Sequence, residues 1–207
     1  NLSGIFLGRE TLMTIRTFIA AATAASALMA GAANAADCPV DVDDPFDLEA
    51  AQIEDIYNCL KDAMAEGYAK EGDEVGANYR SWTVTSTRPA VAGPHGNRLL
   101  QTFANDVAAE QYLKFAEEGV KMPAGSVLAK ESITISKKKK QARVGPLFIM
   151  TKMEDGAIPE TDDWLYAGLQ PNGKVMKIKQ SFCHNCHEGF AAQGDLGYPV
   201  EEVRITN

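Results

Sequence analysis

The first strong pattern in the chain is helical. From Asp47 onward, apolar residues recur at spacings of three and four, which places them on one face of an amphipathic helix. Gly72 follows as a stop signal. We expect this helix to pack against a sheet rather than form a cofactor wall. The apolar positions are Ile53, Ile56, Tyr57, Leu60, Met64 and Tyr68.

From residue 82 the pattern changes to the alternation that is typical of strands. Four runs show it: residues 82–86, 98–103, 126–135 and 144–150. Lys137, Lys138, Lys139 and Lys140 separate the last two runs, which predicts a hairpin with a lysine-rich tip. Such a tip is usually a solvated turn; docking of an anionic partner is the alternative, since the protein is otherwise acidic.

Two further elements follow from local signals. Asp106 is expected to cap a short helix that Gly119 closes. Residues 164–169 and 174–179 are expected to form a second hairpin, because Asn172-Gly173 between alternating runs is a strong turn signal. Together these elements predict an α+β fold, an antiparallel sheet of five or six strands flanked by helices.

The N-terminal region has the composition of an export signal. Arg16 lies in a short positive region after Met13, residues 18–30 are small and apolar, and Ala33-Asn34-Ala35 suits signal peptidase. We therefore expect residues 1–12 to precede the true start, residues 13–35 to be a signal peptide cleaved near Ala35, and residues 36–207 to form one domain. The run is too weak to span a membrane. The predicted location is the periplasm.

The net charge of the chain restricts the classes of partner that it can bind. The formal net charge is −8 and hydrophobic residues make up 45% of the chain. An acidic protein is poorly suited to bind nucleic acid, while this apolar fraction is sufficient for a core.

The most informative motif is Cys183-His184-Asn185-Cys186-His187. Two cysteines separated by two residues, with a histidine directly after the second, form the attachment signature of c-type haem. One helical turn between the thiols suits the two vinyl groups on one porphyrin edge. His187 is then the proximal iron ligand. A thioredoxin-like pair needs a βαβ domain after the motif, and a zinc knuckle needs a second, distant ligand pair. Both are weaker interpretations.

Haem attachment at Cys183 and Cys186 leaves Cys38 and Cys59 in an oxidising compartment, where a disulfide is expected. Two alternatives remain: a buried thiol at Cys59 with Cys38 free, or a bridge between chains through Cys38.

The position of the haem-attachment motif along the chain differs between classes of c-type haem protein. Small class I cytochromes c carry it near the N-terminus and use a downstream methionine, whereas no methionine follows Met176 here. The helical cytochromes c′ need four long helices, which the strand pattern lacks.

A series of segments, in one order, resembles the cytochrome P460 family. The segments start at Tyr79-Arg-Ser-Trp82 and His95-Gly-Asn-Arg98, and they continue through residues 122–132, 145–150, 163–166, 183–187 and 194–199. The resemblance implies a β-rich, usually homodimeric, periplasmic haem c protein whose iron has one open face. Family members oxidise hydroxylamine, and the β-type cytochromes c′ among them bind nitric oxide or carbon monoxide.

Three functions are therefore compared. The first is oxidation of hydroxylamine with an electron-carrier protein as partner. The second is capture or sensing of nitric oxide by a β-type cytochrome c′. The third is simple electron transfer, which needs a strong sixth iron ligand. The first two share an open distal site for a small nitrogen species, and the missing downstream methionine counts against the third.

Several residues are candidates for the distal side of the iron, and the sequence does not choose between them. Enzymatic relatives carry a lysine joined to the porphyrin, for which the resemblance offers Lys114 or Lys121; a surface lysine is the commoner role of Lys114. Phe115 is beside Lys114, and the gas-binding relatives use distal phenylalanines, so the subfamily stays undecided. His95 is a candidate distal ligand, although a turn histidine usually bonds backbone. Glu131 is a distal base only if it points into the pocket. The remaining candidates, Met122, Met150 and Met153, are more often core residues.

Overall fold

The long strand β5 (Val127–Ser136) is the centre of an antiparallel sheet. The computed structural model describes residues 38–205, and within them the sheet has eight strands. One edge of β5 pairs with β4, while its other edge pairs with β6 and then β7. The other strands are β1 (Cys38–Pro39), β2 (Thr83–Val84), β3 (Ala90–Ala92), β4 (Arg98–Ala104), β6 (Gln141–Val144), β7 (Leu147–Lys152) and β8 (Trp164–Leu169).

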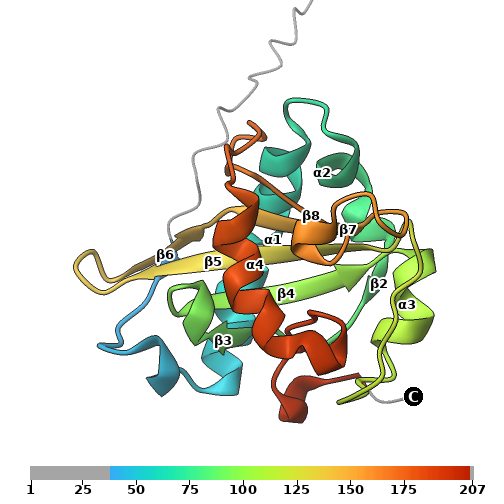
Figure 1. The fold of residues 1–207 in the computed structure, drawn as a ribbon. Helices are drawn as coiled ribbons and strands as arrows, with labels where there is room; N and C mark the ends of the chain where they lie inside the picture. The colour runs from blue at the N-terminus through green and yellow to red at the C-terminus, as the bar shows by residue number, and fades with distance from the viewer. Residues whose placement is uncertain (1–37, 206–207) are drawn as a thin grey trace, which may run out of the picture. The chain divides into compact units, whose positions relative to one another are not determined.

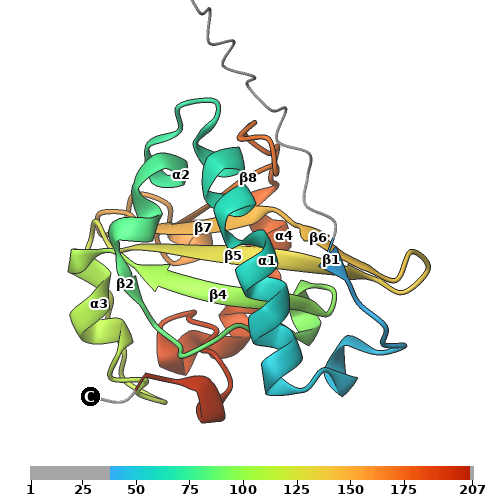
Figure 2. The same ribbon diagram turned by 180° about the vertical axis from the view of Figure 1, so that it is seen from behind.

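The helices lie on both sides of this sheet, so the predicted α+β class is confirmed. Figures 1 and 2, seen from opposite sides, show α1 (Ala50–Ala69) on one face and α4 (Gln180–His187) on the other. The α1 stripe is confirmed, because Ile53, Ile56, Leu60, Met64 and Tyr68 are buried. The two short helices are α2 (Glu74–Asn78) and α3 (Asp106–Tyr112).

The predicted single strand 144–150 is wrong. It divides at Gly145 and Pro146 into the end of β6 and the start of β7. The Gly145 N–H donates to the Ser132 carbonyl at 2.8 Å, and a Cβ on Gly145 would lie 2.4 Å from Ser132 Oγ. The chain therefore crosses very close to β5 at this point, where only glycine fits, and the following proline interrupts the ladder.

The second predicted hairpin forms only its turn. Gly173 has a φ of 82°, and the Gln170 N–H donates to the Lys174 carbonyl at 2.8 Å. Beyond the turn there is no strand over 174–179, only one isolated bridge at Val175. Met176 and Ile178 instead lie close over Gly168, so the chain crosses β8 and delivers α4 to the face of the sheet.

The prediction for α3 is wrong at both ends. Asn105, rather than Asp106, is the N-cap, because its side chain accepts from the Ala108 N–H at 3.0 Å. The helix ends at Tyr112, and Phe115 adopts a φ of 45°, well before Gly119.

The N-terminal segment is tied to both the helix and the lysine-rich hairpin. Cys38 and Cys59 form the predicted disulfide within the chain, with their Cα atoms 6.3 Å apart. Lys140 forms an ion pair with Asp41, and Lys137 Nζ lies 3.8 Å from Asp44 Oδ2. Part of the basic cluster is therefore neutralised by the chain's own acidic residues.

The region from 38 to 205 contains no helix long and apolar enough to cross a membrane. The expected signal peptide and its cleavage near Ala35 lie outside the described residues.

Candidate functional site

Helix α4 is held against β8 by its first residue. The Gln180 side chain accepts from the Tyr166 N–H and donates to the Tyr166 carbonyl, both at 2.8 Å. This amide thus bonds both backbone groups of one strand residue, as a neighbouring strand would. It fixes the position of the helix one turn before its first cysteine.

The three residues of the motif share one cavity. Spacings of three and four put Cys183, Cys186 and His187 on the same side of α4, and all three line a cavity of about 400 Å³. Neither cysteine forms a disulfide. His187 is 8% exposed, Cys186 is exposed, and burial raises the pKa of the half-buried Cys183 thiol.

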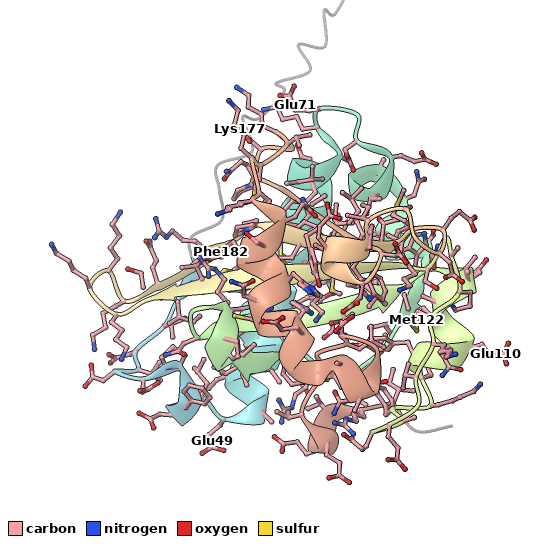
Figure 3. The ribbon with its side chains drawn as sticks, viewed as in Figure 1. Glu49, Glu71, Glu110, Met122, Lys177 and Phe182 are labelled. Carbon is pink, nitrogen blue, oxygen red and sulfur yellow. A yellow bond between two sulfur atoms is a disulfide. The ribbon has the colours of Figure 1, made fainter. Side chains whose placement is uncertain are left out.

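The remaining walls of the cavity come from the sheet and from the loop that follows α4. They are largely apolar, which suits a flat hydrophobic group. Phe182, labelled in Figure 3, lies at the rim and is 78% exposed. Other apolar side chains that line the cavity are Val91, Leu100, Phe148, Ile149 and Met150.

His187 is oriented by the loop after its helix. Its Nδ1 lies 2.7 Å from the Asp195 carbonyl oxygen. Because a carbonyl only accepts, Nδ1 carries the hydrogen, and Nε2 keeps a free lone pair. This is the arrangement in which a histidine binds a metal. Burial, followed by the nearby Lys130 charge, lowers the pKa of His187 to about 4, so its ring is neutral at pH 7.

Lys130 is a buried cavity residue that the sequence analysis missed. It lies on β5, lines the cavity at 5% exposure, and donates from Nζ to the Gly197 carbonyl at 3.0 Å. Burial lowers the pKa of its ammonium to about 8. A lysine directly after the apolar residues Val127, Leu128 and Ala129 of β5 was the available signal, since such a charge is rarely buried without a partner.

The two lysines that the resemblance offered are not at the cavity. Lys114 is exposed and bonds Gln111 within its own helical segment, and Lys121 is also exposed. Neither lines the cavity. The structure therefore brings neither of these two candidates to the cavity, because both precede the strand that forms the cavity wall. Phe115 does not line the cavity either.

Glu131 points away from the cavity, so it is not a distal base. It accepts from Tyr57 Oη at 2.9 Å and from Arg80 Nε at 2.6 Å, and it also bonds Tyr79 Oη. All of these groups lie on the α1 side of the sheet. Burial, together with the Glu131 charge, raises the pKa of both phenols.

His95 does face the cavity. It lies in the 3-10 helix η3 (Gly93–His95), and its ring centroid is 4.9 Å from that of Phe148. Within residues 38–205 its ring nitrogens make no hydrogen bond, so the expected bond to backbone is not found. Burial lowers the pKa of His95 to about 3, with a smaller effect from Lys130.

Of the three methionine candidates, one lines the cavity and two do not. Met150 lines the cavity. Met122 is buried in a cluster with Ala108 and Tyr112 of α3 (Figure 3), and Met153 does not line the cavity.

A helix that presents two thiols and a metal-competent imidazole to one apolar cavity defines the site of a haem protein. The comparison with protein families agrees, because the model for cytochrome P460 matches residues 76–197. The chain therefore belongs to the cytochrome P460 family, and this membership implies a haem cofactor and bound iron. No curated protein matches the chain.

Proposed function

We propose that this chain is a c-type haem protein in which Cys183 and Cys186 anchor the porphyrin and His187 binds the iron. Each S–H would add across one vinyl group, so that no atom is lost. The observation that carries the proposal is the shared face of these three residues at one cavity, with His187 Nε2 free for a metal.

We further propose that the iron takes a small nitrogen species, hydroxylamine or nitric oxide, on the side opposite His187. When bound, the haem supplies a coordination position and one-electron redox chemistry. The protein is expected to work in the periplasm, to pass electrons to a carrier protein and to form a homodimer, as the family resemblance implies.

The cavity supplies two polar groups for such a ligand. Lys130 carries an amine whose pKa near 8 suits holding or releasing a proton at neutral pH. Tyr166 Oη is buried without a hydrogen-bond partner in the described region and lines the same cavity. The phenol is thus available to donate to a bound ligand, and apolar neighbours exclude water around it.

A covalent link between Lys130 and the porphyrin would distinguish an enzyme from a gas-binding protein. A porphyrin link of the enzymatic kind would form from this lysine, because Lys130 lines the cavity. Proteolysis of the haem-loaded protein would then give a haem peptide that contains both α4 and the Lys130 segment. A haem peptide with α4 alone favours a β-type cytochrome c′ that binds gas without catalysis.

The spectrum of the purified protein tests the proposal. Reduced protein should change its Soret band on addition of nitric oxide, and ferric protein should be reduced by hydroxylamine if it is an enzyme. Lys130→Met should abolish the hydroxylamine reaction, whereas Lys114→Met, an exposed lysine, should leave it intact. A spectrum that responds to neither compound contradicts the proposed ligand class.

Simple electron transfer is retained as a second candidate because of one observation. The His95 and His187 rings lie close together across the cavity, with centroids 6.4 Å apart. A second strong ligand on the iron is what electron transfer needs.

A further inference from the structure

The carbonyl that orients His187 belongs to a loop with a disfavoured backbone conformation. Gly194 and Asp195 follow one another with φ values of 70° and 64°, both in the left-handed region. A residue with a side chain is disfavoured there, because its Cβ lies too close to a carbonyl oxygen. The Asp195 carbonyl oxygen, 2.7 Å from His187 Nδ1, therefore depends on surrounding contacts that hold this backbone in place.

The peptide group between Gly194 and Asp195 is hydrogen-bonded at both its nitrogen and its oxygen. The Asp195 N–H donates to the Phe190 carbonyl at 3.0 Å. The Gly194 carbonyl accepts from Trp164 Nε1 at 3.2 Å. Because the peptide group is planar, it cannot rotate without breaking one of these two bonds, so its orientation is fixed.

Trp164 is itself held firmly. It is the first residue of β8 and is 1% exposed, in a buried cluster that includes Leu196. Thr161 Oγ1 donates to the Trp164 carbonyl at 2.7 Å, and Lys152 Nζ lies 5.5 Å from the centroid of the indole ring. A strand residue with so many contacts presents its N–H to the loop in one orientation.

The loop is also packed closely against a distant segment of the chain. A Cβ on Gly194 would lie 3.1 Å from the Val120 carbonyl oxygen and 3.2 Å from Val120 Cγ1. Leu196, two residues further on, is fully buried. These contacts leave little space for the loop to relax, but none of them sets the orientation of the peptide group as the indole N–H does.

A buried indole N–H usually finds an acceptor, so the bond from Trp164 could serve the tryptophan alone. The identity of the acceptor argues for a further role. It is the carbonyl of the residue directly before the one that bonds His187, and Trp164 does not line the cavity. Any influence of Trp164 on the site therefore passes through this loop.

We propose that Trp164 is a positioning residue for the iron ligand, because its N–H holds the peptide group from which the Asp195 carbonyl reaches His187 Nδ1. The inference rests on the proposed haem attachment and His187 ligation, and it deepens them by naming a residue that sets the basicity of the proximal imidazole. A hydrogen bond from Nδ1 raises the basicity of a histidine toward its metal. Such a bond strengthens the iron–histidine bond and favours ferric over ferrous iron.

The variant Trp164→Phe removes the N–H and keeps an aromatic ring in the buried cluster. In haem-loaded ferrous protein, resonance Raman spectroscopy should show a lower iron–histidine stretching frequency than in wild type. The midpoint potential should be higher. Trp82→Phe is the matched control, since Trp82 is the other of the two tryptophans and packs against the cluster that contains the α1 stripe. Both quantities should keep their wild-type values in this control.

A second variant separates the hydrogen bond from the packing. A tryptophan analogue with sulfur in place of the N–H, incorporated at residue 164 by codon suppression, has nearly the shape of tryptophan and no donor. It should show the same two shifts as Trp164→Phe. Because it preserves the packing, its result also decides the matter if Trp164→Phe does not mature.

The possible failures are distinguishable. Wild-type frequency and potential in the sulfur analogue, or shifts of equal size in Trp82→Phe, overturn the role of Trp164 and leave the proposed function standing. Wild-type protein without covalent haem overturns the proposed function, and this inference with it.

Discussion

Lys130 and Glu131 are neighbours on β5, yet they face opposite sides of the sheet. Lys130 Nζ bonds the Gly197 carbonyl at the cavity, while Glu131 accepts hydrogen bonds from Tyr57 and Arg80 on the α1 side. This follows from the alternation of side chains along a strand. One face of β5 therefore forms the candidate site, and the other face holds the fold together.

Loss of the Glu131 charge should destabilise the protein. Glu131→Gln leaves Arg80, whose side chain is 28% exposed, without its buried ionic partner. We expect the free energy of unfolding to fall by about 2–4 kcal/mol, since breaking a buried pair leaves an uncompensated charge. Urea unfolding measures it. Asp41→Asn removes the partner of the exposed Lys140 and should change stability little. Equal losses in the two variants would contradict the structural role of Glu131.

The disulfide should contribute to stability without affecting the haem site. It joins residues 21 positions apart, for which the chain-entropy model gives about 3 kcal/mol. The double variant Cys38→Ala/Cys59→Ala should therefore unfold at lower urea concentration, with an unchanged visible spectrum. A variant as stable as the wild type would mean that the bond constrains little in the unfolded chain.

The proximal hydrogen bond depends on the backbone at Asp195. This residue has a φ of 64°, and its carbonyl accepts from His187 Nδ1. Asp195→Gly keeps this conformation at little strain, whereas the β-branched Asp195→Val opposes it. In ferrous protein, resonance Raman spectroscopy should show a lower iron–histidine stretching frequency for the valine variant alone. The same frequency in all three proteins would argue against control by this carbonyl.

Asp163 should give a defined pH dependence. Its carboxylate accepts from the N–H groups of Ile158 and Gly156 at 2.8 and 2.9 Å, and these bonds lower its pKa below 3.8. A lowered pKa contributes stability above the unfolded value, and this contribution is lost as pH falls through the folded value. The melting temperature of Asp163→Asn should be below that of wild type at pH 6. The gap should close below pH 3.8, and a gap that widens in acid would contradict this assignment.

The elements that the sequence predicted well are those with a strong local signal. The α1 stripe has a clear helical period, and the lysine-rich turn separates two clear strands. Where prediction failed, a contact distant in sequence decided the outcome. Gly145 divides a run because it crosses Ser132, and residues 174–179 leave the sheet because Met176 and Ile178 pack over Gly168.

The same distinction applies to the residues of the candidate site: those with a local signal were predicted, and those placed by distant contacts were not. Cys183, Cys186 and His187 are visible as a motif because their spacing is local. Lys130 and His95 meet them only through strand pairing, and periodicity cannot show which face of β5 a cofactor would occupy. In the structure, Lys130 faces the side of the sheet on which α4 lies.

The most direct test of the whole account is the mass of the haem peptide. Protein matured in a host with c-type haem attachment should give, after proteolysis, an α4 peptide that carries one haem and survives acid–acetone extraction. Cys183→Ala/Cys186→Ala should give the same peptide without haem, while Cys38→Ala/Cys59→Ala should retain it. An unmodified wild-type α4 peptide, or haem that acid–acetone removes from the wild-type protein, would contradict the account.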